Sequence, residues 1–295
     1  MNAWMWGLGL VVIATVLISL AGRALQRRLR LMRDDHSLRP SLWNRFYAVD
    51  WGETATNNYG FAPADEDGAS DRFQRQMYRE MFKALTLSGK QVAPGARLLE
   101  VSCGRGGGLD AFLEAAGPGL FEATGLDVAA SAVSFCEHKW TRRSGLNFVE
   151  GCAMSLPFPD ASIDVLLNVE ASNDYPDRRR FFAEVRRVLK PGGVFLYADT
   201  EKAKHEGRMA SELDEAGFGF QLRDITPNVV AACREDSPRR REVIASAVPL
   251  PARLVLRSEL ANYAAMEGSE KFGHFASGQR RYYLTAARPV MAMAS

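Results

Sequence analysis

LLEVSCGRGGG, residues 98–108, combines a short apolar strand pattern with a glycine-rich loop and the start of a helix. Glycines let the backbone turn sharply and lie directly against a ligand, because a Cβ atom would occupy the space that the ligand needs. The stretch predicts a strand-to-helix turn in which Ser102, Gly104 and Gly106 contact a ligand. The loop alone does not identify that ligand, since dinucleotide-binding proteins use a similar device.

Strand and helix patterns alternate after this loop. Strands are expected at 98–101, 123–126, 146–149, 163–168 and 194–198, and helices at 109–116, 129–139 and 178–189. The alternation predicts a parallel sheet with helices on both faces, a Rossmann-like doubly wound α/β fold. Pro191-Gly192-Gly193 is expected to form the turn between the last of these helices and the next strand. A final strand at 281–286 is expected to run antiparallel.

Two carboxylates indicate what the loop binds. Asp127 ends the second predicted strand, where a carboxylate can accept both hydroxyls of a ribose. Glu100 lies inside the first strand beside the loop, where it would repel a pyrophosphate and attract a cationic amino-acid group. A solvated or ion-paired acid would explain either residue taken singly. Together with the loop, they favour a ligand that carries both a ribose and an amino-acid group.

Three runs of sequence resemble class I S-adenosylmethionine-dependent methyltransferases: residues 98–108, LPFPDASIDVLLNVEAS at 156–172 and FFAEVRRVLKPGGVFLYAD at 181–199. The chain looks most like mycobacterial phthiotriolone and phenolphthiodiolone dimycocerosate methyltransferases, and less like sterol methyltransferases. The resemblance implies S-adenosyl-L-methionine as the cofactor. The cofactor-binding residues that it implies are Glu100, Ser102, Gly104, Gly106, Asp127, Val128, Cys152, Ala153 and Asn168.

One position departs from the family pattern on the adenine side of this site. Such proteins commonly place an aspartate near the adenine, where this chain has Gly151-Cys152-Ala153. The Cys152 side chain cannot make the charged hydrogen bond of an aspartate. We therefore expect only the backbone of Cys152 and Ala153 to line the adenine.

The fourth predicted strand leads into residues 168–175, at the sheet edge where ligands collect. Methyl transfer from a sulfonium is an in-line displacement, so the protein must align the acceptor and remove one proton. Glu170 is the expected proton acceptor or cation stabiliser, and its position resembles a glutamate in the EAT segment of sterol methyltransferases. Asp174 and Tyr175 are expected to assist. The alternative is that Glu170 only holds the loop or the cofactor.

Residues 49–63 resemble, more loosely, the WG and HFAP pieces of sterol methyltransferases. In those enzymes an N-terminal arm closes over an apolar substrate. Trp51, Tyr59 and Phe61 are therefore expected to contact the acceptor. The alternative for aromatic residues in such a connector is ordinary packing.

The N-terminal residues 4–22 carry no charge, and as a helix they would extend about 28 Å, enough to cross a bilayer. The run is followed directly by Arg23, Arg27, Arg28, Arg30 and Arg33. By the positive-inside rule these charges keep the rest of the chain on the cytoplasmic side. The sequence predicts a single-pass membrane protein with a cytoplasmic catalytic domain. The alternative is a helix that packs on the protein's own core or lies in the membrane surface.

These patterns divide the chain into four segments. They are a transmembrane anchor at 1–22, a juxtamembrane connector and substrate arm at 23–90, the S-adenosylmethionine-binding core at 91–200, and a C-terminal part at 201–295 that caps the acceptor and supplies the last strands. The arm contains apolar residues spaced by four between 73 and 85, which predicts an amphipathic helix. The C-terminal part is expected to hold a helix at 209–216, a strand at 218–222 and longer helices to about residue 268.

Composition mainly excludes classes of protein. The chain has 295 residues, of which 47% are hydrophobic and 24% charged, and its formal net charge is +2. These values are those of an ordinary globular protein, and they give no reason to expect a nucleic-acid partner. No metal site is expected, because neither the four cysteines nor the four histidines show a ligand spacing.

Three functional classes follow from these patterns. The leading one is an enzyme that methylates a hydrophobic, lipid-like or secondary-metabolite acceptor, with O-methylation favoured over C-methylation of an isoprenoid or sterol-like chain. The second is a membrane-tethered regulator that retains a cofactor pocket without catalysis. An NAD-dependent oxidoreductase is last, because no Tyr-x-x-x-Lys or catalytic histidine pattern accompanies the glycine-rich loop.

Overall fold

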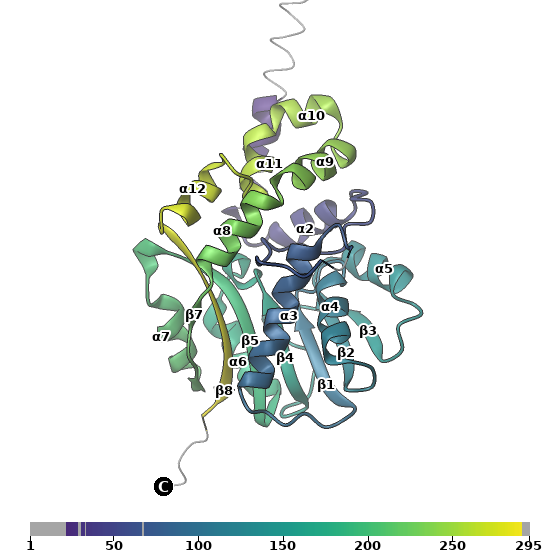
Figure 1. Ribbon diagram of the computed structural model, residues 1–295, viewed down its shortest axis with the longest axis vertical. Coiled ribbons are helices and arrows are strands. Elements are labelled where there is room, and N and C mark those ends of the chain that lie inside the picture. The colour runs from purple at the N-terminus through teal and green to yellow at the C-terminus, as the bar shows by residue number, and fades with distance from the viewer. Residues whose placement is uncertain (1–21, 29–30, 33, 67, 291–295) are drawn as a thin grey trace, which may run out of the picture.

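The computed structural model describes residues 22–28, 31–32, 34–66 and 68–290 (Figure 1). The expected membrane anchor at 1–22 lies outside these residues except for Gly22. Among the helices that the structure does describe, none is both long and apolar enough to cross a membrane.

Eight strands form one mixed sheet in the order β3-β2-β1-β4-β5-β8-β6, with β7 paired to β8. The strands are β1 (Ala96–Val101), β2 (Phe121–Asp127), β3 (Leu146–Glu150), β4 (Ile163–Val169), β5 (Leu189–Lys202), β6 (Phe218–Gly219), β7 (Arg223–Asp224) and β8 (Arg280–Pro289). Strands β1 to β5 run parallel, whereas β8 is antiparallel to β5. The predicted Rossmann-like sheet with a final antiparallel strand is confirmed.

The strands β1 and β4 form the switch point of the sheet, since the strand order reverses between them. Ligands of open α/β sheets bind at this point, beyond the carboxyl ends of the strands. The strands read as apolar runs because both of their faces are buried. In β1, for example, Leu98 packs with Met77 and Phe112 on one face of the sheet, and Leu99 packs with Phe182 on the other.

The described helices cover both faces and one end of the sheet (Figure 1). They are α2 (Arg39–Tyr47), α3 (Arg72–Leu87), α4 (Gly107–Ala116), α5 (Ala130–Lys139), α6 (Arg178–Val188), α7 (Arg208–Glu215), α8 (Thr226–Glu235), α9 (Ser237–Ala247), α10 (Leu250–Val255), α11 (Arg257–Tyr263) and α12 (Glu270–Ala276). The predicted amphipathic helix is confirmed as α3, whose Phe73, Met77, Met81 and Leu85 are all buried. Helices α2 and α9 to α12 gather at one end of the sheet, which allows them to cap a site at the strand ends (Figure 1).

Two local predictions were wrong. The Pro191–Gly193 run does not form a turn between helix and strand, because α6 ends at Val188 and β5 already begins at Leu189. The run lies inside β5, where the register with β4 shifts, and an irregularity of this kind accommodates a residue without an N–H donor. The strand expected at 218–222 is only Phe218–Gly219, and a separate two-residue strand follows at 223.

Candidate functional site

The glycine-rich loop packs too closely to admit side chains. Gly104 and Gly106 adopt left-handed conformations, with φ of 55° and 76°. A Cβ atom on Gly104 would lie 2.7 Å from the Tyr47 hydroxyl, and one on Gly106 would lie 2.7 Å from Nε1 of Trp140. Both positions therefore require glycine, and the end of α2 covers the loop.

Asp127 ties this loop to the end of β2. One of its carboxylate oxygens accepts a hydrogen bond from the Gly104 N–H and the other from the Ala129 N–H, each at 2.9 Å. Burial raises the pKa of Asp127, and the backbone donors oppose that rise. Each carboxylate oxygen retains a lone pair, so the side chain can also accept hydrogen bonds from the two hydroxyls of a ribose.

Glu100 of β1 and Asn168 of β4 each leave one buried acceptor unsatisfied. The Tyr78 hydroxyl donates to Oε1 of Glu100 at 2.6 Å, whereas Oε2 and the Oδ1 of Asn168 are buried and receive no hydrogen bond from the described residues. The β1–β4 register pairs Glu100 with Leu167, which precedes Asn168. Burial raises the pKa of Glu100 to about 8. A ligand ammonium would supply an N–H donor and a compensating charge to Glu100, so this carboxyl fits the amino group of S-adenosylmethionine.

Tyr175 connects the glycine-rich loop to β4. Its hydroxyl lies 2.6 Å from Oγ of Ser102 and accepts a hydrogen bond from Nδ2 of Asn168 at 2.9 Å. Burial raises the pKa of Tyr175 far above its ordinary value, so the phenol remains protonated. The structure therefore gives Tyr175 a positioning role beside the cofactor residues, and an exchange of protons with the acceptor is disfavoured.

The adenine side of the predicted site is formed where β2 and β3 end together. The Gly151 N–H donates to the Asp127 carbonyl at 2.9 Å, which brings Val128, Cys152 and Ala153 to the same edge. Cys152 is exposed and Ala153 is buried. Among the described residues, the Cys152 sulfur accepts a hydrogen bond from the Met154 N–H of its own turn and from no other donor. The backbone, and not the thiol, therefore provides the polar groups at this edge.

Glu170 follows β4 directly and lies on the acceptor side of the edge. It adopts φ of 52°, an unfavourable conformation for a residue with a Cβ, and such strain concentrates at functional sites. Its Oε1 accepts a hydrogen bond from the Tyr59 N–H at 2.7 Å. Burial raises the pKa of this half-buried carboxyl to about 8. The nearby Tyr282 hydroxyl and Lys271 ammonium lower that pKa, and the charge of Asp199 raises it.

The other predicted catalytic and substrate residues lie in different surroundings. Asp174 forms a 3.7 Å ion pair with Arg39 and accepts a hydrogen bond from it through its carbonyl, so Asp174 holds α2 against the loop after β4. Trp51 packs against Phe46, with ring centroids 4.9 Å apart. Phe61 is buried in the hydrophobic core. Of the three predicted arm residues, only Tyr59 contacts Glu170.

Several residues of the site carry no signal in the sequence. Tyr263 from α11 donates a hydrogen bond to Asn57 at 2.7 Å, and Asn57 donates to the Tyr47 hydroxyl at 3.2 Å. This chain of contacts closes the aromatic face of α2 over the cofactor loop. The aromatic spacing near Tyr47 is visible in the sequence, whereas nothing there indicates Tyr263 or Lys271. Their roles arise from the packing of α11 and α12 against the arm.

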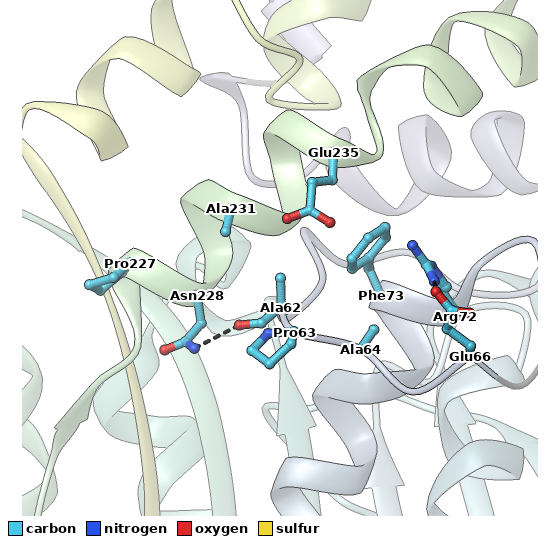
Figure 2. A pocket seen from close by; sticks show the side chains of 10 residues that line it. All are labelled: Ala62, Pro63, Ala64, Glu66, Arg72, Phe73, Pro227, Asn228, Ala231 and Glu235. Carbon is cyan, nitrogen blue, oxygen red and sulfur yellow. Dashed lines mark hydrogen bonds and ion pairs between the residues drawn. The ribbon is translucent and has the colours of Figure 1, made fainter.

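A surface pocket of about 480 Å³ lies between the start of α3 and α8 (Figure 2). It is lined by Ala62, Pro63, Ala64, Glu66, Arg72, Phe73, Pro227, Asn228, Ala231 and Glu235. None of the predicted site residues is among them. Glu66 and Arg72 are already paired with each other at 3.2 Å, and Asn228 donates to the Ala62 carbonyl at 2.7 Å (Figure 2). This pocket is separate from the candidate site.

Comparisons with known proteins agree with this geometry. The methyltransferase domain family matches residues 99–197. A probable phthiotriol/phenolphthiotriol dimycocerosates methyltransferase 2 of Mycobacterium ulcerans is 36% identical over 208 residues, which cover 70% of this chain and 76% of that protein. A fatty-acid O-methyltransferase of Mycolicibacterium smegmatis is 39% identical over 149 residues, which cover 48% of this chain and 51% of that protein.

Solved structures share the fold at lower identity. A geranyl diphosphate methyltransferase superposes with a TM-score of 0.61 at 16% identity, covering 85% of this chain and 99% of that chain. The cyclase SpnF superposes with a TM-score of 0.65 at 19% identity, covering 87% of this chain and 97% of that chain. At these identities the likeness concerns the fold, and the reaction must be argued from the site.

Proposed function

Because the chain belongs to the S-adenosylmethionine-dependent methyltransferases, the family that includes the mycobacterial phthiotriol/phenolphthiotriol dimycocerosates methyltransferases, we propose that it methylates an oxygen of a hydrophobic, lipid-like acceptor. The single observation that carries this proposal is the placement of Glu170, a half-buried carboxyl at the switch point of the sheet. The names of the relatives support a lipid acceptor, since they act on dimycocerosates and on fatty acids.

The cofactor supplies an electrophilic methyl group carried on a sulfonium. When bound, it would be held at the strand ends by the chain's own residues: Glu100 would accept from the amino group and Asp127 from the ribose hydroxyls, with Asn168 at the end of the neighbouring strand. The backbone at Cys152 and Ala153 borders the adenine. These assignments are proposals that follow from the unsatisfied acceptors of β1 and β4.

Glu170 takes the proton from a hydroxyl acceptor in this proposal. A carboxyl with a pKa of about 8 is well matched to general-base catalysis near neutral pH. The Tyr59 N–H holds the carboxyl in place at 2.7 Å. C-methylation through a carbocation is the second candidate, in which the ionised carboxylate would stabilise the cation and remove its proton.

The test compares Glu170→Gln with Asp174→Asn, using a labelled methyl group and dodecanol in detergent micelles. We expect Glu170→Gln to bind the cofactor normally and to slow turnover by about 10²–10⁴-fold, the usual contribution of a positioned acid–base group. Asp174→Asn serves as the control, because Asp174 contacts Arg39 and not Glu170. Near-normal turnover of Glu170→Gln with a hydroxyl acceptor would exclude Glu170 as the base.

We propose in addition that the protein is a single-pass membrane protein with its catalytic domain on the cytoplasmic side. The described chain begins at one pole of the molecule, where helical residues 22–28 lie beside α10 (Figure 1). Gln26 donates a hydrogen bond to the Val255 carbonyl at 2.9 Å, and Gly22 packs on the Val255 side chain. Residues 22–28, which would follow the membrane-spanning segment, are thus fixed to α10 at the end of the molecule.

The surface at this pole supports the same proposal. Leu25, Leu250 and Leu254 are exposed there, and Leu254 retains 68% of its accessible surface. Arg27 and Arg28 are exposed beside them. Apolar side chains flanked by arginines are the combination that an anionic membrane surface attracts. The acceptor would then be taken from the bilayer on which the cap rests.

A further inference from the structure

Two cations lie on the acceptor side of the site without an acidic partner. Lys271 of α12 and Arg280 at the start of β8 are half-buried, and no carboxylate oxygen of the described residues lies within 4.0 Å of either. Burying an unpaired charge is costly, and some buried cations of this chain avoid that cost by pairing with a carboxylate. The guanidinium of Arg240, for example, lies 2.9 Å from Asp236.

The neighbours of the two cations fix them without neutralising them. Lys271 donates a hydrogen bond to the Tyr59 hydroxyl at 2.7 Å, and Arg280 donates to Oγ1 of Thr200 at 2.8 Å. Phe275 packs on Tyr59 with ring centroids 5.4 Å apart, and the Arg280 guanidinium lies 6.0 Å from the same Phe275 ring. The Nε of Arg280 is buried and has no acceptor among the described residues. The two cations therefore flank an aromatic pair, with N–H donors still available.

Glu170 is near Lys271 but forms no ion pair with it or with Arg280 within 4.0 Å. Burial raises its pKa to about 8, so the carboxyl is mostly neutral below that pH. Burial and the nearby positive charge of Arg280 together lower the pKa of Lys271 to about 8, and the charges of Glu170 and Asp174 oppose this fall. Two cations thus repel each other beside a carboxyl that remains largely uncharged. An anion placed between them would relieve this repulsion.

We propose that Lys271 and Arg280 bind the anionic head group of the acceptor, which makes an acidic lipid such as a long-chain carboxylic acid the preferred substrate class. This inference rests on the proposed function, since it assumes that the acceptor enters on the Glu170 side of the sheet edge. It defines more closely which lipid that site selects. Neither residue lies in the three runs of sequence on which the family resemblance depends.

Methyl transfer to such an acceptor needs no base, so Glu170 acts as the base only towards hydroxyl acceptors. A carboxylate oxygen forms the new bond to the methyl carbon while the bond from carbon to sulfur breaks, and the sulfur keeps the electron pair. No proton moves, because a carboxylic acid is already ionised at neutral pH. The product is a neutral ester, so its attraction to Lys271 and Arg280 is lost and its release is favoured.

The test measures equilibrium binding, so that it does not depend on turnover. Dodecanoate and dodecanol, which have chains of equal length, are titrated into the full-length protein in detergent without a methyl donor. We expect dodecanoate to bind at least about tenfold more tightly than dodecanol, and Lys271→Met and Arg280→Met each to weaken dodecanoate binding by about tenfold to a hundredfold, the usual effect of removing a hydrogen bond to a charged group. Dodecanol binding should change little in either variant.

Two controls keep the result interpretable. Lys83→Met removes a lysine that is 63% exposed on α3, and we expect it to leave dodecanoate binding unchanged. Lys271→Arg restores the charge and should recover most of the affinity. Equal affinity of the wild-type protein for dodecanoate and dodecanol, or unchanged binding in both methionine variants, would overturn the inference. Failure of methyl transfer to every lipid would instead contradict the proposed function, and it would leave this binding result standing.

Discussion

At the scale of single residues, the buried carboxyl of Glu100 lowers the stability of the free protein and provides an acceptor for the ligand. It is fully buried with one unsatisfied oxygen, and burial raises its pKa from the ordinary value of 4.5 to about 8. The folded protein therefore binds this proton more tightly than the unfolded chain does. It follows that the contribution of Glu100 to stability falls as the pH rises from about 4.5 to about 8.

Replacing this carboxyl by an amide gives two opposite effects. Glu100→Gln should weaken S-adenosylmethionine binding by about 1.5–3 kcal/mol, because a charged hydrogen bond to the ammonium is lost. The same variant should gain melting temperature relative to the wild type at pH 8 and gain little at pH 5, since glutamine cannot ionise. Calorimetric titration and thermal unfolding at the two pH values measure both effects. A melting difference that is the same at both pH values would show that Glu100 is not the titrating group.

The pH dependence of turnover tests Glu170 in a similar way. A base must be ionised to act, so the rate with a hydroxyl acceptor such as dodecanol should rise with pH and level off above about 8. Burial raises the pKa of Glu170 most and Asp199 adds to the rise, whereas the Tyr59 N–H, the Tyr282 hydroxyl and Lys271 lower it. The profile is measured with saturating cofactor. A flat profile between about pH 6 and pH 9 would show that proton removal by Glu170 is not part of the rate-limiting step.

At the scale of elements, the glycine-rich loop and α2 form a coupled pair. Gly104 and Gly119 share a left-handed backbone, but only at Gly104 would a Cβ meet a neighbour, the Tyr47 hydroxyl at 2.7 Å. Gly119→Ala should therefore lower the free energy of unfolding by the backbone strain alone, about 1–2 kcal/mol. Gly104→Ala should cost more than this control, and adding Tyr47→Phe should recover part of the difference. Equal losses in the two alanine variants, measured by denaturant unfolding, would show that α2 does not press on the loop.

The sheet and the cofactor edge could be predicted from the sequence because their signals are local. Apolar runs that end in Gly104, Asp127 or Asn168 place polar groups at parallel strand ends, and the register confirms that these ends meet. The Pro191–Gly193 turn was predicted wrongly, because proline and glycine mark a break in pairing without saying whether the strand continues beyond it. Here β5 continues, and residues 191–193 are accommodated by a shift in the register between β4 and β5.

At the scale of the whole molecule, the C-terminal part of the acceptor side could not be predicted, because its residues come from distant segments. Tyr59 contacts Glu170 across 111 positions of the chain and Lys271 across 212 positions. Neither Lys271 nor Tyr263 lies in a motif, and α11 and α12 have weak periodicity in the sequence. Their place follows from the docking of the arm onto the C-terminal helices. Glu170 itself was predictable from its position after β4.

The pole formed by residues 22–28 and α10 should face the bilayer. A spin label on Leu254→Cys, in a Cys152→Ser background that removes the exposed thiol, should collide with lipid-soluble oxygen when the full chain is reconstituted in anionic vesicles. The control is Leu87→Cys at the end of α3, where the leucine is 74% exposed and should remain in water. Equal access of an aqueous relaxing agent to both labels would contradict this orientation.

The most direct measurement gives the full-length protein S-adenosylmethionine with an isotopically labelled methyl group, together with a membrane lipid extract. Lipids that gain one labelled methyl group are then identified by mass spectrometry. We expect the wild-type protein to label lipids, and acidic lipids before neutral ones, while Glu100→Gln labels them only at a raised cofactor concentration. Normal binding of S-adenosylmethionine without labelling of any lipid would contradict the assignment of this chain as a lipid methyltransferase.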